Sequence, residues 1–278
     1  MKMIMRKIYS HRTIDGDDKQ KMIDLRSSEP LLVSNYKQLV ELVAKISYNN
    51  RDFNIYFRGQ DREYLWPKNK RTMILPTIYR DLGIGKEVHS NFMSRMKLLE
   101  KAEKELIKML SSHQGQHDET FQEFKEIRWA ILQHYRVCDT PLIDLTTSLR
   151  AACSFVLNNN RKDGILYILG LPNINGSISF YVEENLSILK LISICPPFAL
   201  RPHFQDGYLA CNFPIDTSCF HMRFNDFSRR LLAKFKLNNV RGKFWNKDFR
   251  YIPENALYPN DNDEVYRICE NIKALLSV

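Results

Sequence analysis

The 278-residue sequence lacks the short motifs that mark several large enzyme classes. It contains no glycine-rich phosphate loop, no H-E-x-x-H zinc motif, no G-x-S-x-G elbow and no EF-hand loop. It also has no internal repeat, and its ten glycines and eleven prolines are ordinary numbers for a folded chain. The classes that depend on these motifs are therefore unsupported.

Long apolar runs are absent as well. No run approaches the length of about 18 residues that a transmembrane helix needs. The stretch 1–12 has charges but no apolar segment of the kind found in a secretory signal. These features predict a cytoplasmic protein without a membrane partner.

The six cysteines show no C-x-x-C spacing, and no histidine lies at zinc-finger distance from a cysteine pair. We expect reduced, mostly buried thiols and no metal, with a disulfide set or a metal site as the alternative.

Acidic residues are fewer than basic ones, 32 against 41, which gives a net charge of +9. Such an excess favours an anionic partner such as a nucleic acid, a nucleotide or a membrane surface, although many soluble proteins carry it without one. The segment 223–247 is the most basic, and aromatic residues are interleaved in it. It is typical either of a single-stranded nucleic-acid site or of a solvated helix face over core aromatics.

Hydrophobic periodicity predicts an α+β or α/β domain with a mixed sheet, and we expect the α+β class. The expected strands are 53–57, 142–145 and 164–169, with further short apolar runs at 186–195 and 208–213. The expected helices are 36–46, capped by Ser34 or Asn35, then 88–110, 121–135, 149–157, 227–236 (amphipathic and basic) and 264–276. Residues 1–34 are expected to form a polar arm, and 35–278 a single domain.

The first candidate site residue is Arg58, which comes at the end of the apolar run 53–57 and precedes Gly59. A guanidinium there can grip a phosphate or ribose, and the glycine lets a ligand approach the backbone. A plain ion pair at a strand end is the structural alternative.

A row of hydroxyl residues, Thr146, Thr147 and Ser148, stands between a predicted strand and a predicted helix. These side chains can bind sugar hydroxyls or an amide, or cap the helix, and both roles are compatible. Asp144 can orient Arg58 or His134, or it can be an ordinary strand carboxylate.

Two further segments carry polar candidates. His134 and Tyr135 end a predicted helix, where a histidine is more often a structural hydrogen-bonding residue. The stretch 201–207 offers Gln205, which can present an amide to a ligand or belong to an ordinary turn.

Taken in order, these pieces resemble FRG-domain proteins. The resemblance covers about residues 35–275 and rests on the order of several fragments: Tyr56-Phe57-Arg58-Gly59-Gln60, Trp66, Pro76, Gln133-His134-Tyr135, Asp144 to Phe155, Arg201-x-x-x-Gln205-x-Gly207, and 252–261. The chain departs from the family at Arg136, where glycine is usual, at Pro141, where arginine is common, and at Leu145, where tryptophan is usual. These departures leave the ligand preference open.

The hydroxyl row followed by Ala151, Ala152 and Phe155 is also similar to the strand-plus-helix block of ADP-ribosyltransferases of the Arg–Ser–Glu class. That resemblance implies a split mixed β-sheet with helical insertions that binds NAD as a substrate, with no metal. Arg58 would hold the NAD phosphates or ribose, while Thr147 and Ser148 would order the nicotinamide ribose. The further binding residues expected on this basis are Gly59, Gln60, His134, Tyr135, Asp144, Thr146 and Arg201.

The class has a glutamate where this chain offers Gln205, which keeps a hydrogen bond but loses the negative charge. Losing one such electrostatic contact typically lowers the rate by on the order of 10²–10³. Asp206 or Glu254 are substitutes for that carboxylate.

The resemblance implies two alternative functions. One is an NAD-using ADP-ribosyltransferase or NAD glycohydrolase of a bacterial toxin, effector or phage-defence type, which modifies a protein or nucleic acid and leaves room for an antitoxin or immunity partner. The other is a non-catalytic module that binds a nucleotide or nucleic acid.

Overall fold

The computed structural model describes residues 25–111, 119–158, 161–215, 219 and 222–277. The described residues fall into two compact units. The first unit consists of the described residues within Met1–Ile74, Leu145–Ile174 and Phe227–Leu257, and the second of those within Leu75–Asp144, Asn175–Asp226 and Tyr258–Val278.

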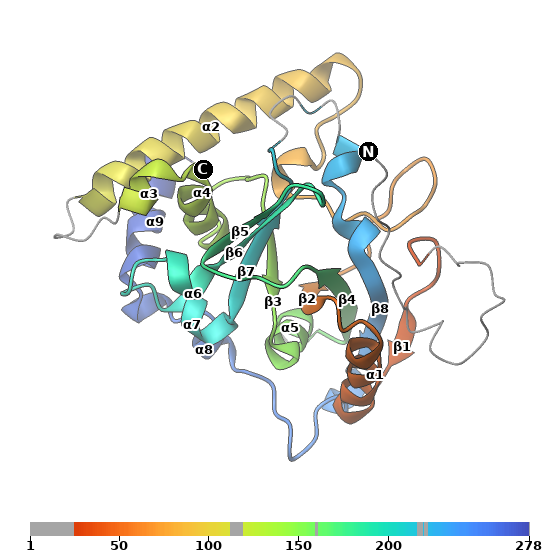
Figure 1. Ribbon diagram of the computed structural model, residues 1–278. Coiled ribbons are helices and arrows are strands. Elements are labelled where there is room, and N and C mark those ends of the chain that lie inside the picture. The colour runs from red at the N-terminus through yellow and green to blue at the C-terminus, as the bar shows by residue number, and fades with distance from the viewer. Residues whose placement is uncertain (1–24, 112–118, 159–160, 216–218, 220–221, 278) are drawn as a thin grey trace. The chain divides into compact units, whose positions relative to one another are not determined.

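The first unit is a mixed β-sheet whose strands lie side by side in the order β1-β8-β4-β2-β3 (Figure 1). β1 pairs parallel to β8, and the other neighbours in this series pair antiparallel. The strand bounds are Leu31–Val33 for β1, Asn54–Gln60 for β2, Ile143–Thr146 for β3, Asp163–Leu171 for β4 and Leu231–Asn238 for β8.

The two faces of this sheet differ in character. On one face Phe57, Ile168 and Ala233 lie in register, and all three belong to the hydrophobic core. The helices α1 (Tyr36–Asn49) and α5 (Leu149–Val156) cover that face with their own apolar residues. Because side chains alternate along a strand, the neighbouring positions of β2 point to the opposite face. The short helix α8 (Glu254–Leu257) also belongs to this unit.

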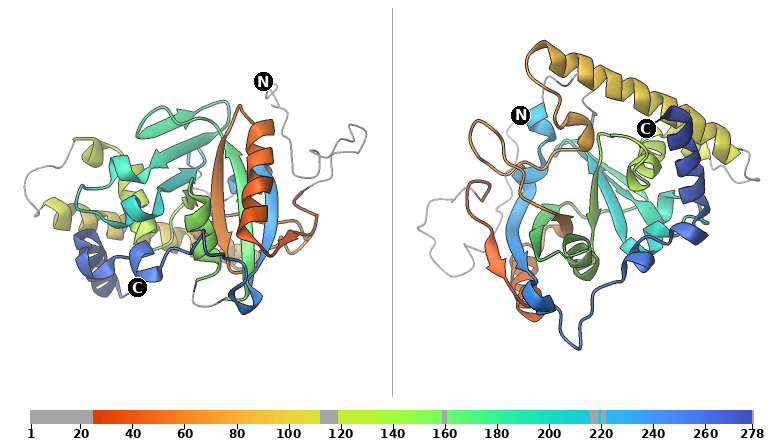
Figure 2. Two further views of the ribbon diagram at one scale, coloured as in Figure 1. Left: turned by 90° about the horizontal axis from the view of Figure 1, so that it is seen from below. Right: turned by 180° about the vertical axis from the view of Figure 1, so that it is seen from behind.

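The second unit combines a layer of helices with the antiparallel strands β5, β6 and β7. Helix α2 packs against α4 and α9 (Figure 2). The helix bounds are Lys86–Ser111 for α2, Glu119–Glu123 for α3, Lys125–His134 for α4, Leu191–Ile194 for α6, Arg201–Gln205 for α7 and Glu264–Leu276 for α9. The strands are Ile178–Tyr181 for β5, Leu186–Lys190 for β6 and Gly207–Cys211 for β7.

Most predicted elements are confirmed to within a few residues. The cap of α1 is Asn35, whose side chain accepts a hydrogen bond from the backbone N–H of Lys37 at 2.8 Å. The predicted helix 121–135 is instead two helices, because Phe124 has an extended backbone and separates α3 from α4. The segment 201–205, read as a polar stretch or turn, is the short helix α7.

The basic amphipathic helix predicted over 227–236 is wrong. Residues Phe227–Arg230 form a 3₁₀ turn, and the strand β8 follows. β8 lies between β1 and β4, and its residues Leu231 to Phe235 are buried in succession. A strand buried on both faces loses the period-two pattern, and its apolar run then resembles a helix.

Residues 1–24 of the predicted polar arm lie outside the described residues. Within the rest of the predicted arm, residues 31–33 form the strand β1. The expectation of a single domain over 35–278 stays a prediction. Mixed α and β structure is confirmed, while the split sheet of an ADP-ribosyltransferase is not tested by it. In the described part of the chain, no helix has the length and apolar character needed to cross a membrane.

The six cysteines all lie in the described part of the chain and form no disulfide, and most of them are buried (Cys153, Cys211, Cys219 and Cys269). Among the described residues, no group of three or more His, Cys, Asp or Glu side chains could hold a metal ion.

Candidate functional site

The first candidate region is the face of the first unit's sheet opposite the one that α1 and α5 cover, and Tyr56, Tyr167 and Lys234 on this face are buried. Arg58 lies within β2 rather than after it, and it is half-buried. Alternation places Tyr56 and Gln60 on the same face as Arg58, because they are two residues away in each direction. This face of β2 is therefore polar, in contrast to the apolar face that carries Phe57.

Gly59 has a structural explanation. A Cβ atom at this position would lie 2.7 Å from Cγ2 of Val156 and 2.9 Å from the carbonyl oxygen of Ala152. Both atoms belong to α5, so the absent side chain allows α5 to pack closely on β2. The sequence predicts that this glycine lets a ligand approach the backbone, but the packing of α5 accounts for it without a ligand.

The hydroxyl row serves the start of α5. Thr146 pairs across the sheet with Phe57, and its Oγ1 accepts a hydrogen bond from the backbone N–H of Ser148 at 3.0 Å. The Oγ of Ser148 caps the helix by accepting from the backbone N–H of Ala151 at 3.2 Å. The capping interpretation is thus confirmed for Ser148, and Thr146 holds the backbone of that cap residue in place.

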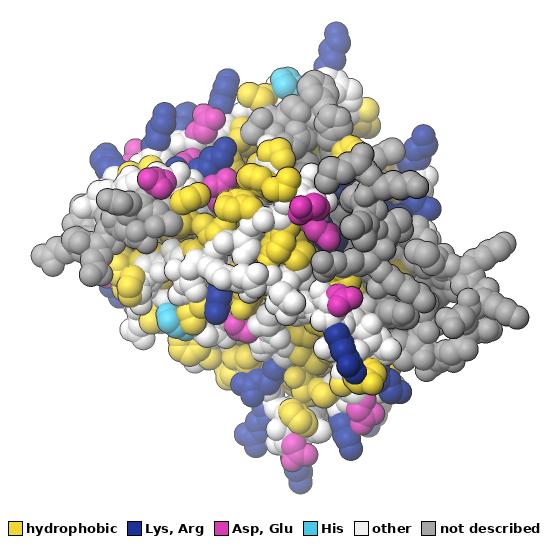
Figure 3. All heavy atoms as spheres, in the orientation of Figure 1, with side chains coloured by type: hydrophobic (Ala, Val, Ile, Leu, Met, Phe, Trp, Pro, Cys, Tyr) yellow, Lys and Arg dark blue, Asp and Glu magenta, His cyan; other side chains and the backbone are white. Residues whose placement is uncertain are grey.

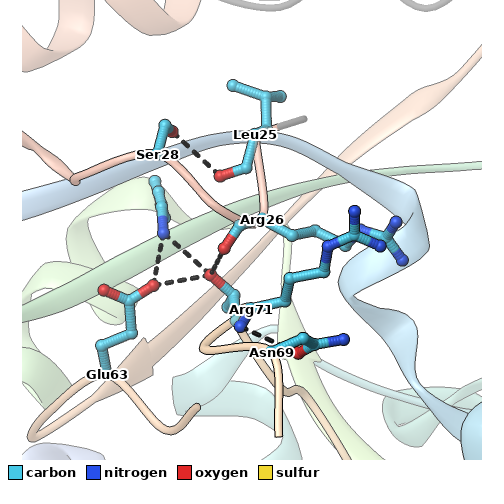
Figure 4. Close-up of polar contacts among 8 residues, drawn as sticks. Leu25, Arg26, Ser28, Glu63, Asn69 and Arg71 are labelled. Carbon is cyan, nitrogen blue, oxygen red and sulfur yellow. Dashed lines mark hydrogen bonds and ion pairs between the residues drawn. The ribbon is translucent and has the colours of Figure 1, made fainter. Parts of the chain in front are cut away.

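A buried polar cluster that sequence reasoning missed lies on the same face as Arg58. Lys234 of β8 is buried, and its Nζ forms an ion pair with Oε1 of Glu63. The Nζ also donates to Oγ1 of Thr72 at 2.8 Å, and that hydroxyl lies 2.6 Å from the same carboxylate oxygen. Figure 4 shows Glu63 in this cluster beside the backbone of Arg26, whose carbonyl oxygen is 3.0 Å from the Thr72 hydroxyl.

In the second unit, the end of α4 forms a second candidate region around a buried imidazole. Nδ1 of His134 lies 4.0 Å from Oδ1 of Asp144, which is beyond hydrogen-bond distance, so the orienting role of this carboxylate stays a prediction. Gln133 holds the other oxygen of Asp144 through its Nε2 at 2.8 Å, and Thr140 donates to Oε1 of Gln133 at 2.6 Å. The Asp144 side chain is 45% exposed and that of His134 is 4% exposed, so a buried imidazole lies near a carboxylate that solvent can reach.

The environment of His134 keeps it neutral. Burial lowers its pKa to about 4, against the opposing effect of Asp144, which favours the charged form. No described residue forms a hydrogen bond with its Nε2, which is buried. A Cβ on Gly207 would lie 2.7 Å from Cδ1 of Leu191, so this glycine allows Leu191 to pack closely, whereas its distance of 3.5 Å from Cε1 of the imidazole would be an ordinary contact.

Arg201 is enclosed by the second unit. Its guanidinium stacks on tyrosine rings and donates to Oδ1 of Asn260 at 2.7 Å and to the carbonyl oxygen of His134 at 3.3 Å. The rings are those of Tyr135, Tyr258 and Tyr266, with centroid distances of 4.8, 5.3 and 4.9 Å. These contacts make Arg201 a structural centre of the unit and leave little of its guanidinium for a ligand.

Asp263, the N-cap residue of α9, completes this structural centre. Its Oδ2 accepts hydrogen bonds from the Tyr135 hydroxyl at 2.7 Å and from the backbone N–H groups of Leu200 and Arg201 at 3.1 Å each. Its Oδ1 caps α9 by accepting from the backbone N–H of Tyr266 at 3.2 Å. Burial, together with the hydrogen bond to Asp263, raises the pKa of Tyr135 far above its ordinary value.

Gln205, proposed as the counterpart of a catalytic glutamate, is the buried last residue of α7. Asp206 follows it in a left-handed conformation with φ of 46°. Glu254, the other substitute for a carboxylate, is exposed at the start of α8 and belongs to the first unit.

The predicted site residues thus form two groups. The first unit holds Arg58, Gly59, Gln60, Thr146, Thr147 and Ser148. The second unit holds His134, Tyr135, Asp144, Arg201 and Gln205.

The net charge of +9 is not collected into one patch on the face drawn in Figure 3, where basic side chains are scattered with acidic ones between them.

Comparison with known families gives one match: the model of the FRG domain matches residues 53–164. This stretch contains the fragments around Arg58, His134 and Ser148, so the resemblance to FRG domains is confirmed there. Arg201, Gln205 and the segment 252–261 lie beyond it. Searches of curated proteins and of solved structures gave no match. The similarity to ADP-ribosyltransferases stays a prediction.

Proposed function

We propose that this protein uses NAD and transfers ADP-ribose to a protein or nucleic acid, or to water, as a toxin, effector or phage-defence component. The observation that supports this most is the pairing of two strands in the first unit. β2 carries Arg58 and pairs directly with β3, which leads through Thr147 to the capped start of α5.

An arginine on one strand and hydroxyl residues at the end of its neighbour suit a phosphorylated sugar. The guanidinium provides a planar pair of donors for phosphate oxygens. Thr147 adds a hydroxyl that both donates and accepts. The same combination binds NAD in the ADP-ribosyltransferases that the sequence resembles.

The direct test is turnover of NAD. Purified protein is incubated with cell extract and NAD labelled in its adenylate half, and nicotinamide release and label transfer are measured. We expect release by the wild type, strong loss in Arg58→Ala, and little recovery in Arg58→Lys, because an ammonium lacks the planar fork. Arg62→Ala is the matched control, since Arg62 is an exposed arginine of the same unit.

Absence of nicotinamide release by the wild type would refute the proposal, as would full activity in Arg58→Ala.

A binding module without chemistry is the second candidate, and the observation favouring it is an exposed segment of the first unit. Lys243 and Lys247 are exposed, and the nearby rings of Phe249 and Tyr251 are 41% and 60% exposed. Basic groups next to exposed rings suit single-stranded nucleic acid. Salt-dependent binding of single-stranded DNA or RNA without nicotinamide release would favour this candidate.

A further inference from the structure

The segment that leads from β8 to α8 in the first unit carries aromatic rings that solvent can reach (Figure 1). Phe244 is a core residue with 1% exposure, but the rings that follow it are less buried. Trp245 is half-buried, while Phe249 and Tyr251 are 41% and 60% exposed. Large rings gathered at one place on a surface indicate an interaction site, whereas scattered single ones do not. We call Trp245, Phe249 and Tyr251 the ring platform.

The ring platform is held in place by contacts with α1 and α5. The ring of Tyr36, the first residue of α1, stacks on Trp245 with a centroid distance of 5.0 Å and lies 5.2 Å from Phe249. At the far end of the platform, the backbone N–H of Ile252 donates to Oγ of Ser154 in α5 at 2.9 Å. Rings with a fixed orientation lose little further freedom when a ligand stacks on them.

Basic side chains surround these rings. Lys243, Lys247 and Arg250 are exposed, and Asp248 is the single acidic residue of 243–251. Protein–protein interfaces are enriched in aromatic residues but depleted in lysine, so this mixture fits an anionic partner better than a second protein. In a single-stranded nucleic acid the bases stack on rings while the phosphates pair with cations, which matches both kinds of side chain.

The ring platform extends toward the start of α5, where the hydroxyl residues of the proposed NAD site stand. Arg150 is exposed in the first turn of α5, two residues after the cap residue Ser148. Burial is the largest cause that raises the pKa of Tyr36 to about 12, and the positive charge of Arg150 opposes it. The guanidinium of Arg150 therefore lies near the ring that stacks on Trp245, and a strand bound to the platform lies beside the start of α5.

We propose that the ring platform binds single-stranded nucleic acid, and that this nucleic acid is the acceptor of ADP-ribose. The inference rests on the proposed function, for which it names the acceptor. In the transfer, the bond between ribose C1′ of NAD and the ring nitrogen of nicotinamide breaks, and its electron pair leaves with neutral nicotinamide. A nitrogen or oxygen atom of a base forms the new bond to C1′ and loses its proton to water. An unpaired base is required, because its edge is accessible and its face is free to stack.

The first experiment measures binding without NAD. A fluorescently labelled single-stranded DNA, the RNA of the same sequence and the duplex DNA are titrated with the protein by fluorescence anisotropy. We expect the single strands to bind more tightly than the duplex, whose paired bases cannot stack on the rings. Tyr251→Ala should weaken single-strand binding about tenfold, and Tyr251→Phe, which keeps the ring, should retain it.

Lys247→Ala tests the electrostatic contribution. Losing one phosphate contact should lower the slope of log K against log salt by about 0.7. Tyr48→Ala is the matched control, because Tyr48 is 67% exposed but lies near the other end of α1, about 18 Å from Tyr36 at 1.5 Å per residue. It should bind the single strand as the wild type does. Unchanged binding in Tyr251→Ala, or equal binding of duplex and single strand, would overturn the docking surface.

The second experiment identifies the acceptor. NAD labelled in its adenylate half is incubated with the wild type, cell extract and the single strand that binds. The label should appear on the nucleic acid, and Tyr251→Ala should raise the KM for the strand about tenfold. Label on protein alone, with nicotinamide released, would overturn the acceptor assignment and leave the proposed function standing. Without any nicotinamide release the proposed function fails and the acceptor assignment with it, whereas the anisotropy titrations still decide whether the ring platform binds nucleic acid.

Discussion

Each unit contains a notable arginine with tyrosines nearby, and the two arginines differ in what surrounds them. Arg201 of the second unit is 4% exposed and is enclosed by stacked rings, an asparagine and a backbone carbonyl. Arg58 of the first unit is half-buried on a strand face whose cross-strand neighbours are Tyr167 and then Lys234. An arginine alone predicts phosphate binding at both positions. Because aromatic rings and hydrogen-bond acceptors surround Arg201, we expect it to stabilise the second unit, and we take Arg58 as the candidate for ligand binding.

The largest expected effect on stability comes from removing the carboxylate of Asp263, which accepts a hydrogen bond from the backbone N–H of Arg201. Asp263→Ala leaves the Tyr135 hydroxyl and the N–H groups of Leu200 and Arg201 without their acceptor and removes the cap of α9. We expect the free energy of unfolding to fall by at least about 3 kcal/mol in a denaturant titration.

The control for that change is Asn35→Ala, which removes an exposed helix cap from the first unit. It should lower stability by about 1 kcal/mol. Equal effects of the two variants would show that Asp263 is no more than a cap, and that the centre around Arg201 is not structural.

A smaller effect follows from the pH dependence of His134 in the second unit. Its folded pKa is about 4, below the ordinary value of 6.5, so between these values only the unfolded state binds the proton. Stability should therefore fall by about 3 kcal/mol as the pH drops from 6.5 to 4, with no contribution above 6.5 and no further loss below 4.

His134→Asn should remove this pH window from the unfolding free energy, whereas His203→Asn, at an exposed position, should retain it. If His134→Asn retained the wild-type slope between pH 6.5 and 4, the imidazole would not be held neutral by burial.

Gly59→Ala tests the packing assignment in the first unit. The added methyl group would meet Val156 and the backbone of α5, so we expect a loss of about 1–3 kcal/mol in thermal or chemical unfolding. Gly85→Ala, where a Cβ would meet nothing within 4 Å but φ is 65°, separates backbone strain from overpacking. If Gly59→Ala left the free energy of unfolding unchanged, the packing of α5 would not explain this glycine, and contact with a ligand would be the better explanation.

The smallest effect concerns Arg136, which stands where FRG domains usually have glycine. Its φ of 55° lies in the left-handed region, which accounts for the preference for glycine. Arg136→Gly should relieve strain of about 1 kcal/mol but lose the hydrogen bond to the Tyr258 hydroxyl at 2.9 Å. Arg136→Ala loses the same contact without relief, so it should be less stable than Arg136→Gly in parallel melts.

These cases also show what the sequence can predict. The helices at 36–46 and 264–276 were predictable because an apolar stripe and a capping side chain, Asn35 or Asp263, coincide. The strand β8 could not be predicted, because a strand buried on both faces shows no alternation of apolar and polar residues. Lys234 within it also looks like a charged residue on the surface of an amphipathic helix.

The candidate site could be predicted from the sequence only where the contacting residues lie close together in the chain. The capping by Ser148 follows from its position before an apolar run. The pair of Glu63 and Lys234 spans 171 residues, so no local pattern indicates it. The packing role of Gly59 cannot be predicted from the local sequence, because its packing partner, Val156, is also distant in the chain.

The central claim is that Arg58, rather than Arg201, binds the phosphates of NAD, and the shift in melting temperature with NAD tests it most directly. At 100 times the dissociation constant, NAD should stabilise the wild type by about 2.7 kcal/mol and raise its melting temperature by several degrees. The account predicts that Arg58→Ala melts near the wild-type temperature without NAD and shows no shift with it. An undiminished shift in Arg58→Ala would contradict the account.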